Sequence, residues 1–288
     1  MIAYNHELYI KEAILGVLAQ ATEFDIELIV ADDCSNDKTQ FVVKEIINNH
    51  PQSNVIKYTR HATNRGMIPN FIWAVEQCKG EYIALCEGDD YWTDPCKLQK
   101  QVSLFEIYPS ASLCVALNER LYNDGRFEKD KKFKGHFSPL IYFQDMGHYF
   151  HTSTFLIRTS NINYLLKKYL KLFSGDGALR YLLISQGPIV VLNDYVSVYR
   201  ITESGVWTSL SVYHKDLIHY KFHKEFRKKF IKEQFKHHLE REIINLKKII
   251  IYEKNNGKIL SYLRNKLYLH YLLIRYYPAD YVIRTWII

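Results

Sequence analysis

Three carboxylates stand within four residues in the stretch Glu81–Trp92, which reads EYIALCEGDDYW. The stretch opens with an apolar, β-prone run, Tyr82–Cys86, which predicts a short strand. Glu87, Gly88, Asp89 and Asp90 follow, and carboxylates this close repel one another unless a cation neutralises them. Mg²⁺ and Mn²⁺ prefer oxygen ligands, typically carboxylates together with substrate phosphates. The pattern predicts a metal–diphosphate site at the end of a strand, and a solvated acidic turn is the alternative.

Strands and helices alternate before and after this stretch. We expect strands at 1–4, 27–31, 55–59 and 82–86, and helices at 5–20, 38–49, 70–78 and 94–108. Such alternation predicts an α/β fold with a mainly parallel sheet and helices on both faces. Ligands of such sheets bind beyond the carboxyl ends of the strands. Three polar clusters, at residues 4–5, 32–33 and 87–90, should therefore converge at one edge. The first strand is short, and we expect it to continue upstream of Met1.

The second half of the chain is less regular. Strands are expected at 113–118, 154–158 and 189–192, with a further edge strand at 195–201, and helices follow from about residue 213. Residues 213–288 contain 17 Lys and Arg against 7 Asp and Glu, whereas the rest of the chain is slightly acidic. We therefore expect two parts, an α/β domain over 1–212 and a basic, aromatic-rich helical region over 213–288.

Composition excludes several classes of protein. No run approaches 18 consecutive apolar residues, so a transmembrane helix is not expected. The five cysteines show no C-x-x-C spacing, which favours reduced thiols and a cytoplasmic protein over a disulfide framework or a zinc site. No recognition motif accompanies the basic charge, so nucleic acid is not an expected partner.

Several short motifs, in their order and spacing, are similar to those of a known family. They are AYNHE near the start, the unit DDCSNDKT after the second strand, Asn64-x-Gly66 with Asn70, the stretch GEYIALCEGDDYW, and the later GD and YR…GVW segments. Over about residues 1–210 the chain resembles the family-2 glycosyltransferases. The resemblance implies a GT-A fold, which is Rossmann-like, and an inverting transfer of a sugar from a nucleotide donor.

The resemblance also implies roles for single residues. Asp33 would recognise the nucleotide base, usually uracil, and Asp89 would hold Mn²⁺ or Mg²⁺ as the second acidic residue of a D-x-D motif. Asp176 stands where the family places its general base. The implied nucleotide-sugar site comprises Ala3, Tyr4, Asn5, Glu7, Asp33, Asn64, Gly66, Asn70, Glu87, Gly88 and Asp89. Acceptor or lid contacts are expected from Asp90, Trp92, His151, Arg200 and Trp207.

Each assignment has a plainer alternative. Asp33 and Asp176 could be ordinary helix caps. His151 could be a core or surface histidine, and Trp92 could simply pack. The resemblance places Arg200 and Trp207 in a late loop that closes over the diphosphate. Relatives often carry a histidine in that segment where this chain has Thr202, which removes one candidate metal ligand.

The basic helical region mixes Lys and Arg with Phe, Tyr, Leu and Ile. Basic amphipathic helices of this kind often lie on anionic membranes. Residues 213–288 are thus expected either to contact the inner face of the plasma membrane peripherally or to serve as a packing or oligomerisation appendage.

Together these patterns predict a metal-dependent inverting glycosyltransferase. It would use a nucleotide-sugar donor, UDP-linked in the first instance, and a saccharide or lipid-linked acceptor in cell-surface polysaccharide assembly. A catalytically weak nucleotide-sugar-binding module and a nucleotidyltransferase are the alternatives. No glycine-rich phosphate loop near the N-terminus supports the nucleotidyltransferase.

Overall fold

The structure is a computed structural model that describes residues 1–133, 139–141, 150–162, 176–202, 205, 209–229 and 232–276. Two compact units divide the chain, Met1–Glu203 and Ser204–Ile288.

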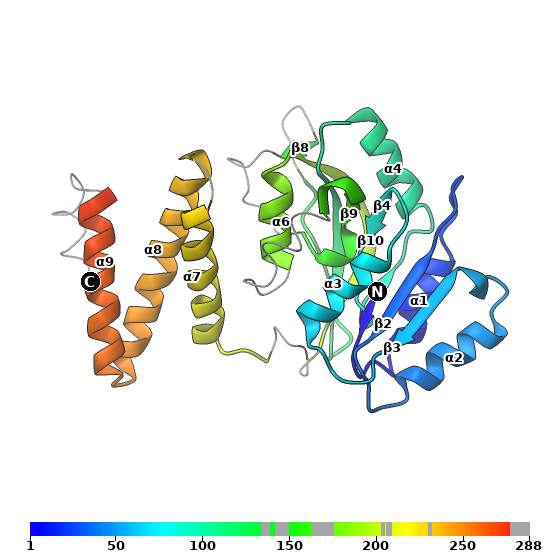
Figure 1. The fold of residues 1–288 in the computed structure, drawn as a ribbon, viewed down its shortest axis with the longest axis horizontal. Coiled ribbons are helices and arrows are strands. Elements are labelled where there is room, and N and C mark those ends of the chain that lie inside the picture. The colour runs from blue at the N-terminus through cyan, green and yellow to red at the C-terminus, as the bar shows by residue number, and fades with distance from the viewer. Residues whose placement is uncertain are drawn as a thin grey trace. The chain divides into compact units, whose positions relative to one another are not determined.

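A three-stranded parallel sheet opens the first unit (Figure 1). Its strands are adjacent in the order β1, β2, β3, and helices connect them. The elements are β1 (Ile2–Ala3), α1 (Ile10–Leu18), β2 (Leu28–Asp32), α2 (Thr39–Asn49), a 3₁₀ turn η1 (Ser53–Val55), β3 (Ile56–Arg60) and α3 (Met67–Gln77). The predicted strands and helices of this part are present, although α1 begins after Tyr9 rather than at Asn5. Asn5 instead adopts a left-handed backbone conformation, with φ 56°.

Helices cover both faces of this sheet because β2 is apolar on both sides. Leu28 and Val30 pack into a core with α1 and α2, whereas Ile29 and Ala31 pack with Ala74 of α3. Alternate residues of a strand point to opposite faces, so one short run supplies both cores. In Figure 1, α2 and α3 lie on opposite sides of β2 and β3.

The second sheet of this unit is mixed, with strand order β4, β9, β6, β10, β5. Among the described strands of this sheet, β6 and β10 alone pair in parallel; β9 pairs antiparallel with β4 and β6, and β5 pairs antiparallel with β10. Its elements, with the helices around it, are β4 (Tyr82–Ala84), β5 (Tyr91–Trp92), α4 (Lys97–Ile107), β6 (Leu113–Tyr122), β7 (Phe127–Lys129), β8 (Leu140–Ile141), η3 (Thr152–Thr154), β9 (Leu156–Arg158), α6 (Asp176–Ile184) and β10 (Ile189–Ile201). The alternation read from the sequence therefore describes the first sheet well and the second only in part.

The strand β10 corrects one expectation. Residues 189–192 and 195–201 form one continuous strand between β6 and β5, not a strand followed by an edge strand. The polar pair Asn193-Asp194 resembles a turn in the sequence, but it lies where the register between β10 and β6 shifts. Such an irregularity bends a strand without ending it.

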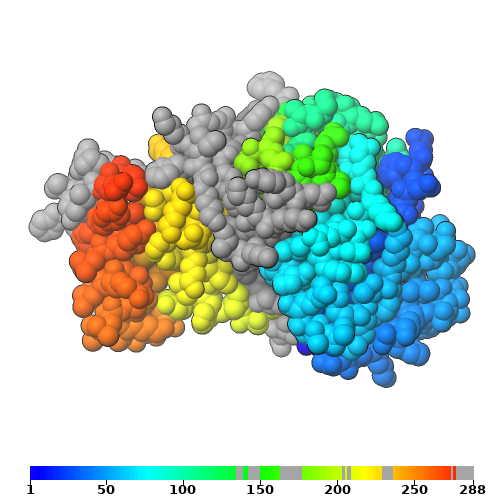
Figure 2. Space-filling model, in the orientation of Figure 1, coloured from blue at the N-terminus to red at the C-terminus, as the bar shows by residue number. Residues whose placement is uncertain are grey.

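Three helices form the described part of the second unit: α7 (Val212–Lys229), α8 (Lys232–Asn255) and α9 (Ile259–Tyr276). Their shared core contains Leu246, Ile250, Leu269 and Leu272. The orange to red atoms of α8 and α9 are exposed on the face that Figure 2 shows. Within the described residues, none of the helices is both long enough and apolar enough to span a membrane.

Candidate active site

The acidic loop, Glu87–Asp90, lies beside the carboxyl end of β1. The Gly88 N–H donates to the carbonyl oxygen of Ile2 at 2.9 Å, and Ile2 and Glu87 form an isolated parallel bridge. Because β1, β2 and β3 are parallel, the residues that follow all three strands meet at this edge. The predicted convergence of the three polar clusters is therefore confirmed.

Gly88 is held so closely that no other residue fits without movement. A Cβ at this position would lie 2.8 Å from His6 Nδ1 and from Ile10 Cδ1, and 3.2 Å from the Cβ of Ala3. The glycine lets the loop approach β1 and α1, and it thereby fixes where the carboxylates on either side of it stand.

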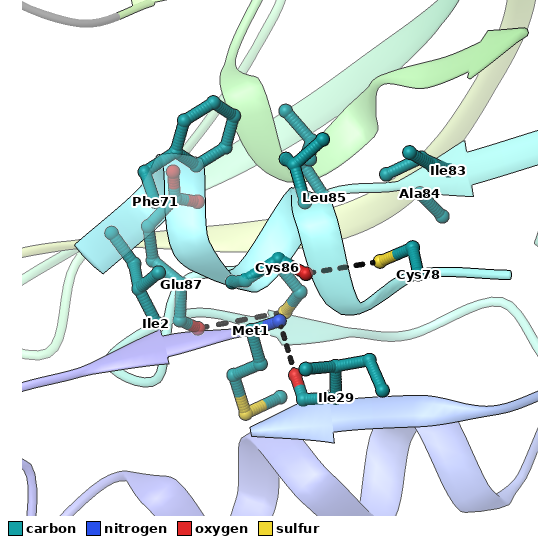
Figure 3. A pocket seen from close by; sticks show the side chains of 12 residues that line it. Met1, Ile2, Ile29, Phe71, Cys78, Ile83, Ala84, Leu85, Cys86 and Glu87 are labelled. Carbon is teal, nitrogen blue, oxygen red and sulfur yellow. Dashed lines mark hydrogen bonds between the residues drawn. The ribbon is translucent and has the colours of Figure 1, made fainter. Parts of the chain in front are cut away.

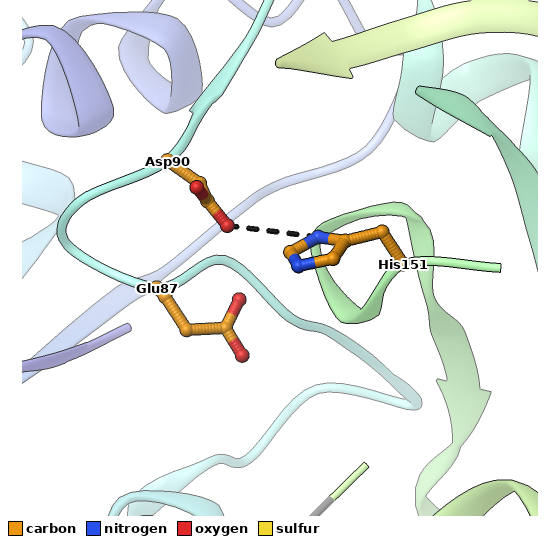
Figure 4. A group of neighbouring side chains, drawn as sticks. All are labelled: Glu87, Asp90 and His151. Carbon is orange, nitrogen blue, oxygen red and sulfur yellow. Dashed lines mark ion pairs between the residues drawn. The ribbon is translucent and has the colours of Figure 1, made fainter. Parts of the chain in front are cut away.

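Asp90 faces inward from this loop. One of its carboxylate oxygens accepts a hydrogen bond from the backbone N–H of Arg200 at 3.0 Å. The other lies 3.6 Å from His151 Nδ1 (Figure 4). His151 is also buried; its Nδ1 lies 2.9 Å from Ser153 Oγ, and its ring stacks on Tyr199. Burial raises the pKa of Asp90 well above its ordinary value, and the charges of Asp89 and Glu87 raise it further.

Arg200 lies in β10, which corrects its expected position in a late loop, whereas its predicted contact with the diphosphate stays a prediction. Its Nη1 donates to the carbonyl oxygen of Asp89 at 2.6 Å, and its guanidinium pairs with Glu12 and lies over the ring of Tyr91. Together with the hydrogen bond from the Arg200 backbone N–H to Asp90, these contacts tie the acidic loop to β10. Arg200 is thus a residue that shapes the loop.

Asp89 is partly exposed to solvent, with its side chain 27% exposed. Its Oδ2 lies 3.9 Å from His6 Nε2. The other ring nitrogen, His6 Nδ1, is buried over Gly88 and has no hydrogen-bond partner among the described residues. Sequence reasoning missed His6. Its position three residues after β1, which ends at the site, was the available signal.

Asp33 holds the loop that follows β3. Its two carboxylate oxygens accept from the N–H groups of Arg65 and Gly66 at 2.7 and 2.8 Å. Asn64 accepts from the Gly66 N–H as well, and the φ of 86° at Gly66 favours glycine. Asp33 is not a helix cap, because α2 begins at Thr39. The structure thus brings Asp33 together with Asn64 and Gly66, and their hydrogen bonds fix the loop after β3.

The loops after β1 and β2 are tied together by side chains. The Asn5 N–H donates to Ser35 Oγ, and Asn5 Oδ1 accepts from the Asn36 N–H, both at 2.9 Å. The Glu7 N–H donates to Asp37, while the Glu7 carboxylate accepts from the Lys38 N–H at 2.8 Å. Tyr4 beside them remains 42% exposed and Ala3 is buried. The structure therefore assigns Asn5 and Glu7 to the contacts between these two loops and leaves the Tyr4 ring exposed beside them.

Two predicted site residues are buried and bonded to protein. Asn70 donates to the Ala31 carbonyl at 3.0 Å and pairs with His61 at 2.9 Å. Trp92 belongs to the core, and its indole N–H donates to the carbonyl oxygen of Ser153 at 2.8 Å. Of the alternatives for Trp92, packing is the one that the structure shows, and its contact with an acceptor stays a prediction.

The remaining predicted residues lie at the boundary of what the structure describes. Asp176 is the first residue of α6, and its side chain lies outside the described atoms. Trp207 lies outside the described residues altogether. Thr202 directly follows β10 and is partly buried. The proposed base and the predicted lid tryptophan thus stay predictions.

A small cavity lies next to the acidic loop, between α3 and the strands β1, β2 and β4 (Figure 3). Its volume is about 30 Å³, and its lining includes Ile29, Phe71, Cys78 and Leu85. One or two water molecules would fill this volume, whereas a nucleotide sugar needs several hundred Å³. The cavity is therefore not the donor site.

Side chains near the acidic loop fit a divalent cation. Glu87, Asp90 and His151 each offer a ligand atom, and these atoms lie within 4.8 Å of one another (Figure 4). Carboxylate oxygens with an imidazole nitrogen are a suitable donor set for Mn²⁺. The predicted ligand Asp89 is not part of this group, but its partly exposed carboxylate lies on the same loop.

Comparison with known proteins relates this geometry to proteins of similar sequence. An uncharacterized protein of Mycobacterium tuberculosis is 35% identical over 213 residues, which cover 72% of this chain and 59% of the relative. The minor teichoic acid biosynthesis protein GgaB of Bacillus subtilis is 34% identical over 91 residues, 31% of this chain and 10% of GgaB. The chain thus spans 59% of the length of the mycobacterial relatives it matches.

Solved structures share the fold at low identity. The structure of S. aureus TarS 1-349 in complex with UDP-GlcNAc has a TM-score of 0.64 and 19% identity, covering 94% of this chain and 78% of TarS. The mannosyltransferase PcManGT from Pyrobaculum calidifontis, in complex with GDP-Man and Mn²⁺, has a TM-score of 0.60 and 16% identity. The match covers 99% of this chain and 81% of PcManGT. These likenesses confirm the predicted GT-A fold with a C-terminal helical region. Residues 1–168 match the family model described as glycosyl transferase family 2, and the chain therefore belongs to that family.

Proposed function

We propose that this chain transfers a sugar, with inversion, from a UDP-linked donor to a saccharide or lipid-linked acceptor in cell-surface polysaccharide assembly. The observation that supports the proposal most directly is the acidic loop held beside the carboxyl ends of three parallel strands. The relatives point the same way, since the TarS complex contains UDP-GlcNAc and GgaB is named for teichoic acid biosynthesis.

The donor would lie across the ends of β1, β2 and β3. Tyr4 offers its exposed ring to the base, and Asp33 has further acceptor capacity on its two oxygens for a base N–H. Asp89 would hold a divalent cation, Mn²⁺ or Mg²⁺, and Glu87, Asp90 and His151 would offer further ligand atoms. Such a cation supplies positive charge for the departing diphosphate.

The acceptor hydroxyl oxygen attacks the anomeric carbon as the bond from that carbon to the diphosphate breaks, and Asp176 takes the hydroxyl proton.

Thermal unfolding with UDP, in the presence and absence of Mn²⁺, tests the donor site. A bound nucleotide stabilises the native chain by mass action, so the wild type should gain stability only with both components. Asp89→Asn should lose this gain, and Asp124→Asn, an exposed turn residue, should keep it. Retention in Asp89→Asn with loss in His151→Gln would instead assign the cation to the group of Glu87, Asp90 and His151. A gain that is independent of Mn²⁺ in every variant would refute the metal assignment.

Release of UDP from UDP-N-acetylglucosamine tests the chemistry separately. Asp176→Asn should bind UDP with Mn²⁺ as well as the wild type does, while turnover falls by about 10²-fold or more. Unchanged turnover would assign the base to another residue. Binding of UDP by the wild type without turnover on any sugar nucleotide would favour the nucleotide-sugar-binding module.

A further inference from the structure

An apolar stripe runs along the outside of α9. It consists of Leu260, Leu263, Leu267 and Tyr271, whose exposed fractions are 85%, 48%, 72% and 49%. Spacings of three, four and four residues place these side chains on one face of the helix. We call this face the outer α9 stripe.

The outer α9 stripe is not needed for the core of the second unit. Leu269, Leu272 and Leu273 of the same helix are fully buried, and they pack with Leu246 and Ile250 of α8. The helix therefore has two apolar faces, of which only one is covered in the structure. Single exposed apolar residues are ordinary, but a contiguous stripe of this kind marks a surface that binds something.

The charged residues of α9 itself are all positive. The sequence of α9 contains no Asp or Glu, and it contains Arg264, Lys266 and Arg275, with Lys258 immediately before the helix. Arg275 donates to the hydroxyl of Tyr271 at 2.9 Å, so one of these cations lies directly at the stripe. Glu253 at the end of α8 is buried and is bonded to Tyr213 and Asn265, so it does not offset this charge at the surface.

We propose that the outer α9 stripe docks on an anionic lipid surface. A helix lying in the membrane interface buries an apolar face at the boundary of the acyl chains while its Lys and Arg side chains contact lipid phosphates. A second copy of this chain fits less well, because two α9 helices facing each other would bring Arg264 and Arg275 of both copies together. The proposal deepens the proposed function, since a lipid-linked acceptor is held at such a surface.

Vesicle sedimentation with the full chain tests the proposal. The protein should pellet with vesicles of phosphatidylglycerol and phosphatidylcholine, much less with phosphatidylcholine alone, and less again as salt is added. Leu260→Ser/Leu267→Ser should weaken binding by about tenfold or more, because two apolar side chains no longer enter the interface. Arg264→Gln/Arg275→Gln should reduce the preference for phosphatidylglycerol. Phe41→Ser, which alters an equally exposed apolar residue on α2, is the matched control and should bind as the wild type does.

Circular dichroism and UDP binding keep the outcome unambiguous. Both leucines are more than two-thirds exposed, so the double variant should retain its helix content and its affinity for UDP. Unchanged vesicle binding by a folded double variant would overturn the proposal. The proposal would equally fail if the wild type does not bind vesicles, or if it dimerises through this stripe in sedimentation equilibrium and the double variant does not. Loss of UDP binding with retained vesicle binding would count against the proposed function alone.

Discussion

Lys97 is a single residue whose charge state the fold controls. Its side chain is fully buried, its Nζ donates to Gln101 Oε1 at 2.8 Å, and its ammonium group lies 4.1 Å from the centroid of the Trp92 ring. Burial lowers the pKa of Lys97 to about 7 from an ordinary value of 10.5. The folded chain therefore binds the Lys97 proton more weakly than the unfolded chain does.

The sign of the resulting pH dependence follows from linkage. Between pH 7 and 10.5 the unfolded chain keeps this proton and the folded chain has lost it, so the Lys97 contribution to the free energy of unfolding rises with pH. We expect Lys97→Met to lack this contribution. Its stability relative to the wild type should be highest near pH 7 and below, and should fall with rising pH by up to about 1.4 kcal/mol per unit.

Urea unfolding at several pH values between 7 and 10 measures this difference. Lys100→Met on the same helix is the matched control, because hydrogen bonds to Asp94 and Asp194 raise the pKa of Lys100. Both chain states keep the Lys100 proton in this window, so the control should show no slope relative to the wild type. A parallel pH dependence for Lys97→Met and the wild type would mean that Lys97 stays charged when buried.

Residue-level prediction worked best where a side chain follows a strand directly. Glu87, Asp89 and Asp33 were placed at the site because their spacing after apolar runs is visible in the sequence. The roles of Asn5 and Glu7 could not be read in this way, since their partners lie some 30 residues away on another loop. Arg200 was likewise misplaced, because its contacts with residues 89 and 90 depend on sheet pairing that the sequence does not display.

Among the elements, α7 and α8 are joined by a buried ion pair. Arg227 Nε donates to Glu242 Oε2 at 2.6 Å, with the two side chains 9% and 0% exposed. The hydroxyl of Tyr268 on α9 donates to the other oxygen of Glu242 at 3.0 Å, which extends the network to a third helix. The pair links α7 to α8, although its net stabilisation is small because both charges lose water.

Removal of one partner should nevertheless be costly. We expect Arg227→Met to lower the free energy of unfolding of the second unit by about 3–5 kcal/mol, because the Glu242 charge is left buried without its cation. Lys228→Met removes a neighbouring surface ion pair with Glu225, and it should change the free energy of unfolding by less than about 1 kcal/mol. Denaturant unfolding followed by circular dichroism compares the two variants. Equal small effects would show that water reaches Glu242.

Element-level prediction was accurate for strands that follow one another in a parallel sheet. The period of the apolar residues located β2, β3, α1 and α2 to within a few residues, apart from the start of α1. The order of the second sheet was not predictable, because β4 pairs with β9 and β5 with β10, segments far apart in the sequence. Non-local pairing of this kind leaves no local periodicity to read.

At the scale of the whole molecule, the two compact units have separate apolar cores. We therefore expect calorimetry of the full chain to show two unfolding transitions. UDP with Mn²⁺ should raise only the transition temperature of the first unit, since the proposed binding residues lie there. Arg227→Met should lower only the transition temperature of the second unit. A single transition that both changes move would show instead that the units unfold as one.

The cross-links between the loops after β1 and β2 have a consequence for how relatives diverge. Glu7 accepts from the backbone of Lys38 while Asp37 accepts from the backbone of Glu7. Asn5 accepts from the backbone N–H of Asn36, and its own backbone N–H donates to Ser35. A substitution in one loop therefore removes the support of the other. We therefore expect substitutions in residues 5–7 to be accompanied by substitutions in residues 35–39 among relatives. A relative that binds a donor with a different nucleotide base would have to change both loops together.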